Sequence, residues 1–319
     1  MKILFFGTPQ FAAIILQHLI DANMPPIAIV TAPDKPAGRG HKLKNPPVTV
    51  LAAAHHISVL QPISVKEKLF LETLRGYKAD IFVIAAYGKI LPQALLDIPP
   101  KSVINVHPSL LPRHRGPSPI QGAILAGDEV TGVTLMLTDA QMDHGPIVMN
   151  HELRIMNHAI TYMELHDQLA QIAGTLLVKT LPKWIAGEIT PKEQDHSKAT
   201  YTKLLTKEDG KVDWNKNAEY IEQQVRALNP WPGTFTFFKD AQEKQQMLKI
   251  LKANVLMQTK PGLVKPGLVF LTQNEKLAVQ TKENTLIVEE LQLEGGKPMN
   301  SKEFLLGHKG LVGSVFVYS

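Results

Sequence analysis

Three side chains in the middle of this 319-residue chain have the types and spacing that acyl transfer to a nitrogen atom requires. Asn105 carries an amide that can donate to a carbonyl oxygen and stabilise an oxyanion. His107, two residues further on, titrates near neutral pH and can carry a proton or donate to the same oxygen. Asp143 can orient the imidazole, or take the proton of an attacking amine through a water molecule. These three are the candidate catalytic residues.

Each of the three also has an ordinary structural interpretation. A lone Asn at a strand end and an Asp before Gly usually form turns, and a lone His is usually structural. The segment 107–117 favours a catalytic role for these residues over a purely structural one. Its three prolines and one glycine rule out a helix or a central strand and predict a stiff loop, the kind of segment that often carries function.

Two apolar runs lead into the candidate residues. The run 102–106 is dominated by β-branched side chains and predicts a strand that carries the Asn and leads into the His. The run 132–137 predicts a second strand, and the polar loop after it contains Asp143. Ligands of open α/β sheets bind at the carboxyl ends of strands, so we expect the three side chains to converge there.

The N-terminal half predicts an α/β domain. Residues 2–22 have the strand, glycine turn and helix with which a Rossmann-like unit begins, but the dinucleotide fingerprint G-x-G-x-x-G is absent, so NAD is not supported. Hydrophobic periodicity predicts further strands at 27–31, 57–60, 79–86 and 147–155, and helices at 48–55, 65–74, 117–126 and 160–185.

The stretch 105–112, together with 115–116 and 119–121, resembles the signature of the formyltransferases that use 10-formyltetrahydrofolate. Residues 131–134 and 142–145 resemble the second block of that family. The resemblance places the family's catalytic Asn, His and Asp on the three candidate residues. It also implies 10-formyltetrahydrofolate as the co-substrate, with no metal required for the chemistry and no metal site.

The resemblance further implies two loops that line a folate pocket, largely through backbone groups. The cofactor-binding residues that it implies are Ser109, Leu110, Leu111, Pro112, Tyr87, Gly88 and Ile90.

Residues 32–47 form a second unusual segment, with four cations, one anion and many Gly and Pro residues. A solvated loop is the plain interpretation, but long loops without regular structure are uncommon in compact domains and tend to be functional. Spaced cations on a flexible arm can bind phosphates. The segment 33–40 also resembles the insertion by which tRNA-formylating members of the family grip their tRNA. The resemblance implies that Arg39 is the main tRNA contact, with Lys42 and Lys44 adding phosphate attraction.

The C-terminal half predicts a different kind of domain. Residues 186–205 are polar and contain residues that interrupt helices and strands. We therefore predict a catalytic domain at 1–188, a linker at 189–205 and a second domain at 206–319. From residue 234 onward, short apolar runs recur between turns, which predicts a small β-barrel. It resembles the smaller OB-like, tRNA-binding domain of the same family members. Its candidate RNA contacts are Lys207, Lys211, Lys249 and Lys252.

Composition excludes several kinds of site and argues against a membrane protein. The absence of cysteine excludes disulfides, thiolate catalysis and Cys-based zinc sites, and it fits a reducing compartment. No apolar run approaches the roughly 18 residues of a membrane span, and the N-terminus does not resemble a signal peptide. We therefore expect a cytoplasmic monomer with no membrane partner. The net charge of +5 permits a polyanionic partner.

The combined expectation is transfer of the formyl group of 10-formyltetrahydrofolate to the α-amine of initiator methionyl-tRNA, in support of translation initiation. Asn105 and His107 would stabilise the oxyanion, while Asp143 holds His107 and a water that relays the amine proton. Two alternatives stay open. A formyltransferase for an amino sugar nucleotide would not need the basic insertion. A non-catalytic folate- or RNA-binding module would not need the intact Asn, His and Asp.

Overall fold

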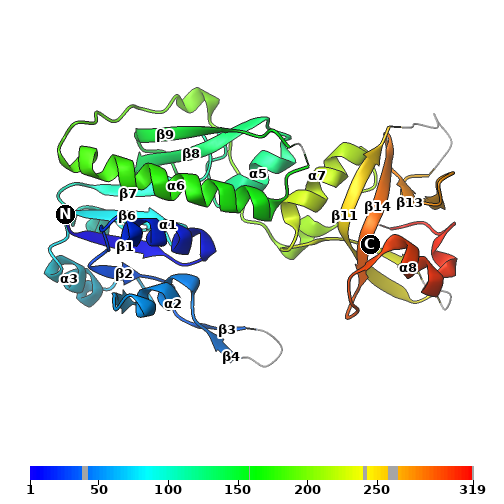
Figure 1. Ribbon diagram of the computed structural model, residues 1–319, viewed down its shortest axis with the longest axis horizontal. Helices are drawn as coiled ribbons and strands as arrows, with labels where there is room; N and C mark the ends of the chain where they lie inside the picture. Colours follow the sequence, from blue (N-terminus) through cyan, green and yellow to red (C-terminus); the bar gives the residue numbers. More distant parts are fainter. Residues whose placement is uncertain (38–41, 158, 240–242, 258–264, 318–319) are drawn as a thin grey trace. The chain divides into compact units, whose positions relative to one another are not determined.

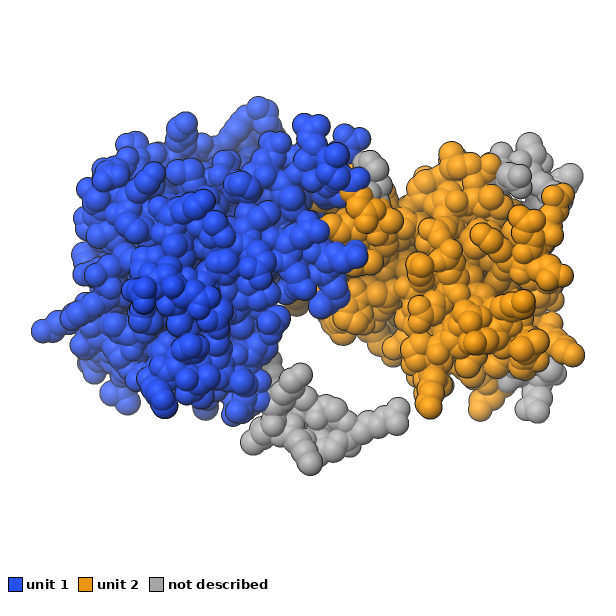
Figure 2. Space-filling view, in the orientation of Figure 1, with its two compact units in different colours: residues 1–120, 129–156, 163–203 blue, residues 121–128, 157–162, 204–319 orange. Residues whose placement is uncertain are grey.

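The computed structural model describes residues 1–37, 42–157, 159–239, 243–257 and 265–317. The chain divides into two compact units, coloured separately in Figure 2. The first unit comprises Met1–Ile120, Glu129–Met156 and Met163–Lys203. The second comprises Gln121–Asp128, Asn157–Tyr162 and Leu204–Ser319. Of the segment predicted as a linker, residues 189–203 group with the first unit and residues 204–205 with the second.

The first unit is built on a seven-stranded sheet in the order β5-β2-β1-β6-β7-β8-β9 (Figure 1). Its first five strands are parallel: β5 (Ser58–Leu60), β2 (Ala28–Val30), β1 (Ile3–Gly7), β6 (Ile81–Ala85) and β7 (Val103–His107). The last two, β8 (Val130–Leu137) and β9 (Ile147–Arg154), are antiparallel to their neighbours. β1 and β6 are buried along their whole lengths, which explains their continuous apolar runs.

Helices cover this sheet, as the Rossmann-like prediction requires, and that prediction is confirmed. They are α1 (Gln10–Asp21), α2 (Pro47–Ala54), α3 (Lys68–Gly76), α4 (Gln93–Leu96) and α6 (Tyr162–Ile185). Most of α5 (Pro119–Leu125) groups with the second unit. Leu71 and Leu74 of α3 share one hydrophobic core with Phe6 and Phe82 of the sheet. α1 and α6 pack so closely that a Cβ atom on Gly174 would clash with the imidazole of His18. No described helix is both long enough and apolar enough to cross a membrane.

The basic segment 32–47 is more regular than its composition suggests. β3 (Lys35–Ala37) and β4 (Lys42–Lys44) form an antiparallel ribbon in which Ala37 pairs with Lys42. The expectation of an irregular loop is therefore wrong for these strands. Pairing between two short segments satisfies their backbone groups, and composition alone does not reveal such pairing. Arg39 lies outside the described residues, and only the backbone of Lys42 and Lys44 is described.

The second unit is an antiparallel β domain, as predicted. Its sheet has the order β10-β11-β14-β13-β12, and β15 also pairs with β14. The strands are β10 (Thr234–Lys239), β11 (Gln245–Leu256), β12 (Val269–Leu271), β13 (Leu277–Gln280), β14 (Thr285–Leu293) and β15 (Met299–Asn300). Val317 forms a bridge to Phe237 on one edge, and Val315 forms a bridge to Leu268 beside the other. The C-terminal segment thus joins both edges, as a closed OB-like barrel requires.

Two helices close the core of this unit. α7 (Ala218–Leu228) contributes Ile221 and Val225, and α8 (Ser301–Gly307) contributes Phe304. The sequence interpretation missed α8, which is short and depends on a local cap, since the side chain of Asn300 accepts from the Glu303 N–H at 2.9 Å. The last apolar run after residue 234 forms only the isolated bridges of Val315 and Val317 within the described residues.

Candidate active site

Asn105, His107 and Asp143 meet in the first unit. The amide Nδ2 of Asn105 donates to Oδ1 of Asp143 at 3.3 Å. Nδ1 of His107 lies 3.6 Å from the same carboxylate oxygen, which is longer than a direct hydrogen bond. Asn105 and His107 are two residues apart on β7, so their side chains project from the same face of the sheet. The imidazole is buried, with its side chain 5% exposed.

Asp143 reaches this position by a route that the sequence pattern did not predict. β8 is antiparallel to β7, and its last residue, Leu137, pairs with Ile104 near the start of β7. The carboxyl ends of the two strands therefore do not lie together. The three side chains converge as expected, but they do so beside the carboxyl end of β7 alone. The connection between β8 and β9 brings the Asp143 carboxylate back to Asn105 on β7.

Glycines let this connection and the proline-rich loop approach one another. The backbone N–H of Gly116 donates to Oδ2 of Asp143 at 2.8 Å. Gly116 has a φ of 106°, and a Cβ atom there would lie 2.5 Å from the carbonyl oxygen of Thr202. Asp143 itself has a φ of 51°, a left-handed conformation that Asp tolerates better than most residues. The carboxylate is therefore held by both the Asn105 side chain and the Gly116 backbone.

A backbone carbonyl orients the imidazole of His107. Nε2 of His107 lies 2.9 Å from the carbonyl oxygen of His114. A carbonyl can only accept, so Nε2 must carry a proton. Nδ1, which faces Asp143, is therefore the position at which His107 can gain or lose a proton within this arrangement. The sequence interpretation assigned His114 no part in this site.

A buried guanidinium lies beside the site. Arg115 is 1% exposed, and its Nε and Nη2 atoms donate to Oε1 of Gln194 at 3.1 Å and 2.7 Å. Nη2 also donates to Nδ1 of His196 at 2.8 Å, and Nη1 donates to the hydroxyl of Tyr201 at 3.3 Å. These neutral acceptors satisfy the donors of a charged group, which is costly to bury without partners.

Gln194 connects the Arg115 guanidinium to the backbone of Asp143. Its amide nitrogen donates to the backbone carbonyl of Asp143 at 3.0 Å and to that of Gly145 at 2.7 Å. The chain Arg115–Gln194 thus holds the backbone from which the carboxylate projects. The sequence interpretation missed Gln194 because its polar, punctuated surroundings resemble a solvated linker, yet it is 5% exposed. A charged residue inside the predicted stiff loop, Arg115, was the one sequence feature that indicated a need for a buried polar partner such as Gln194.

The implied folate-binding residues at 109–112 are held against β8. The hydroxyl of Thr134 donates to the carbonyl of Ser109 at 2.7 Å and accepts from the N–H of Leu111 at 3.1 Å. The Ser109 hydroxyl donates to the carbonyl of Arg113 at 2.6 Å, and so closes the loop on itself. The Pro112 carbonyl accepts from the N–H of Thr200 at 3.2 Å. Leu110 packs against Gly132 of β8, where a Cβ atom would clash with the carbonyl oxygen of His151 and with the Leu110 side chain.

The implied residues after β6 divide into one core residue and two exposed ones. The ring of Tyr87 packs edge-on against Phe6, with centroids 5.6 Å apart. Burial raises the pKa of Tyr87 to about 12, and within the described part of the chain its hydroxyl has no hydrogen-bond partner. Gly88 is exposed, and Ile90 is 78% exposed. The described residues contain no cluster of three or more His, Asp or Glu side chains that could hold a metal ion.

Comparison with known families matches nearly the whole chain. The family model described as formyl transferase matches residues 1–181, and the one described as formyl transferase, C-terminal domain, matches residues 204–309. A methionyl-tRNA formyltransferase of Chloroflexus aurantiacus is 44% identical over 308 residues, which is 96% of this chain and 97% of that relative. One from Citrifermentans bemidjiense is 40% identical over 317 residues, covering 98% of this chain and 96% of the relative.

Solved structures share the fold at lower identity. An N-formyltransferase of Helicobacter canadensis, in complex with folinic acid and dTDP-3-aminofucose, has a TM-score of 0.62 at 16% identity, over 90% of this chain and 98% of that one. HypX of Aquifex aeolicus, in complex with tetrahydrofolic acid, has a TM-score of 0.60 at 17% identity, over 96% of this chain and 47% of that one.

The hydrogen bonds of Gln194 generate a stability prediction. Gln194→Ala is expected to lower the free energy of unfolding by about 2–3 kcal/mol, because it leaves buried guanidinium N–H groups and two backbone carbonyls unpaired. Gln141→Ala changes an exposed amide in the β8–β9 connection, and it should stay within about 0.5 kcal/mol of the parent. Chemical denaturation measures both, and equal stability of the two variants would contradict the role of Gln194.

Proposed function

Because the chain belongs to the formyltransferase family, with both family domains represented, we propose that it transfers the formyl group of 10-formyltetrahydrofolate to the α-amine of initiator methionyl-tRNA. The observation that carries this conclusion is the 40–44% identity to methionyl-tRNA formyltransferases over nearly the full length of both partners. The reaction supports translation initiation, so the protein works in the cytoplasm. We further propose that it acts as a monomer.

The loop after β6 suits a flat ring ligand such as the pterin of the co-substrate. Gly88 has a φ of 79°, and a Cβ atom there would meet nothing within 4 Å, so the backbone at this point is open to a ligand. Ile90 adds an exposed apolar side chain, while Tyr87 anchors the loop in the core. We infer that the co-substrate is held by backbone groups here and at 109–112. When bound, it supplies the formyl group.

Asn105 is placed to donate to the formyl oxygen. A side-chain amide has two N–H donors, and the contact with Asp143 uses one of them. The second is available for the negative charge that develops on the formyl oxygen as the amine attacks. The Asp143 contact also fixes the orientation of the amide, so that no reorganisation is needed during the reaction.

His107 and Asp143 form the proton-handling pair in this proposal. Nε2 of His107 is engaged by the His114 carbonyl, so a second proton can bind only at Nδ1, opposite the Asp143 carboxylate. An imidazolium in this position places positive charge close to the developing oxyanion. As the amine nitrogen bonds to the formyl carbon, Asp143 Oδ1 accepts the amine proton through a water molecule. The proton then passes to the folate nitrogen as its bond to the formyl carbon breaks, which releases tetrahydrofolate.

The choice of acceptor is tested by direct competition. Purified protein with 10-formyltetrahydrofolate should formylate methionyl-tRNA and leave a dTDP-linked amino sugar unmodified, as followed by formyl incorporation. Formylation of the sugar alone would support the first alternative. Absence of formylation with both acceptors would support a non-catalytic module.

The role of Asn105 predicts a turnover defect. Asn105→Ala should lower kcat by a factor on the order of 10²–10³, the usual consequence of losing one oxyanion donor, with folate affinity little changed. Asn150→Ala on the exposed face of β9 is the matched control and should turn over like the parent. Near-parental kcat for Asn105→Ala would remove this residue from the mechanism.

The basic segment predicts a defect confined to the tRNA. Arg39→Ala should lower kcat/KM for methionyl-tRNA while the slow hydrolysis of 10-formyltetrahydrofolate continues at the parental rate, because the residue is proposed to contact phosphates and not the formyl donor. Lys42→Ala and Lys44→Ala should produce smaller losses and a weaker salt dependence. If tRNA formylation and hydrolysis fall together in Arg39→Ala, the segment supports the fold instead.

A further inference from the structure

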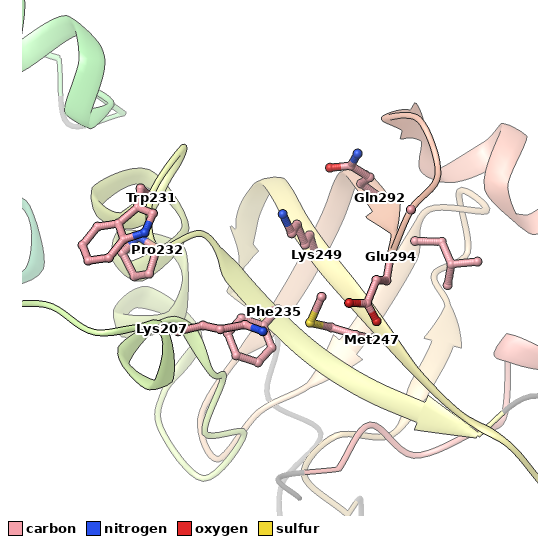
Figure 3. Close-up of a pocket in the computed structure, with 10 residues that line it drawn as sticks. Lys207, Trp231, Pro232, Phe235, Met247, Lys249, Gln292 and Glu294 are labelled. Atoms are coloured by element: carbon pink, nitrogen blue, oxygen red, sulfur yellow. The ribbon is translucent and has the colours of Figure 1, made fainter. Parts of the chain in front are cut away.

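The second unit contains a pocket of about 370 Å³ that the proposed chemistry does not use (Figure 3). Its floor is one face of the barrel sheet. Phe235 of β10 pairs with Lys249 of β11, which in turn pairs with Gln292 of β14, so these three lie in one row across the strands. Met247 lies on the same face, whereas Leu248, between it and Lys249, belongs to the core. The pocket therefore opens on the outer face of the barrel.

Trp231 forms one wall of this pocket. Figure 3 shows it with Pro232 on one side of the floor and Glu294 on the other side, with Lys249 between. Its side chain is 58% exposed, although the turn that carries it is well anchored. Asn229 donates to the carbonyls of Val225 at 2.9 Å and Ile250 at 3.1 Å. The anchored turn therefore holds a large aromatic ring beside the pocket, where a bound ligand can cover it.

The charges around the ring favour an anion. Lys207 and Lys249 both line the pocket, and neither forms an ion pair with another described residue. Glu294 is exposed at the far side, and so an anionic group would avoid that side and lie toward the lysines. An aromatic wall, an apolar floor of Phe235 and Met247, and two free ammonium groups match a nucleobase with its phosphate.

We propose that this pocket binds one unpaired nucleotide of RNA, with the base stacked on Trp231 and its phosphate near Lys207 and Lys249. A base that is stacked within a duplex has no free face to offer the indole, so the site selects single-stranded positions. The inference rests on the proposed function only for the identity of the RNA, namely an unpaired position in the tRNA substrate. The base identity is not specified by stacking, because every base has a π face.

The test uses the full-length protein and a labelled single-stranded RNA octamer, with fluorescence anisotropy as the measurement. Trp231→Leu should weaken binding by at least about tenfold, the loss expected for one stacked base, while Trp231→Phe retains most of the affinity. Lys249→Gln should weaken binding and reduce the salt slope by about 1. The same octamer annealed to its complement should bind more weakly than the single strand.

Two matched controls separate stacking from general effects. Trp184→Phe changes a tryptophan of the first unit, whose indole N–H donates to the Lys101 carbonyl, and Lys302→Gln removes an exposed charge from α8. Both should bind the octamer like the parent. Parental affinity in Trp231→Leu, or equal affinity for the duplex, would overturn the proposal. A poly-glutamate peptide that displaces the octamer and itself binds more tightly would assign the pocket to a protein partner and also overturn it.

Kinetics distinguish this inference from the proposed function. With methionyl-tRNA as acceptor, Trp231→Leu should raise KM and leave kcat unchanged, since the residue lies outside the catalytic unit. If the parent protein binds the octamer through Trp231 but formylates no tRNA, the proposed function fails and the nucleotide site stands. If the parent formylates tRNA and Trp231→Leu has a parental KM and octamer affinity, the site fails and the proposed function stands.

Discussion

The hydrogen bond from the Gly116 N–H to the Asp143 carboxylate is the contact on which the catalytic unit depends. It joins the proline-rich loop after β7 to the connection between β8 and β9, two segments that share no local sequence relationship. Together with the Asn105 amide, it fixes the carboxylate beside the His107 ring. Each side of the contact needs glycine: Gly116 for its positive φ, and Gly145 because a Cβ atom would clash with the Leu137 carbonyl.

The surroundings of this contact explain why charged and polar groups are buried here. Arg115 is completely enclosed, yet its donors are matched by Gln194, His196 and Tyr201. Gln194 then uses its own donors on the backbone that carries Asp143. Hydrogen bonds that link several buried polar groups make the network rigid and favour a single arrangement of those groups. The network therefore fixes the Asp143 backbone in one position beside Asn105 and His107.

The two units have different physical characters that suit two parts of one reaction. The first unit holds a largely buried, hydrogen-bonded cluster of Asn105, His107 and Asp143, to which we assign the chemistry. The second unit has an outer barrel face with an exposed indole and two lysines, where we propose that RNA binds. Reaction chemistry needs exclusion of water and fixed geometry, while recognition of a long RNA needs exposed area, so a division of labour between two domains is physically reasonable.

The sequence by itself determined the α/β class, the order of most strands and helices, the β character of the second unit and the candidate Asn, His and Asp. These follow from hydrophobic periodicity, turn residues and motif spacing, all of which are local properties. Only the tertiary structure decided that β8 runs antiparallel to β7, that 35–37 pairs with 42–44, and that Gln194 supports Asp143. The pairing of 35–37 with 42–44 is local, but a composition rich in Gly and Pro does not reveal it. The other two are contacts between segments distant in sequence. Such contacts depend on which backbone and side-chain groups find partners after the chain has folded, and no local pattern encodes that choice.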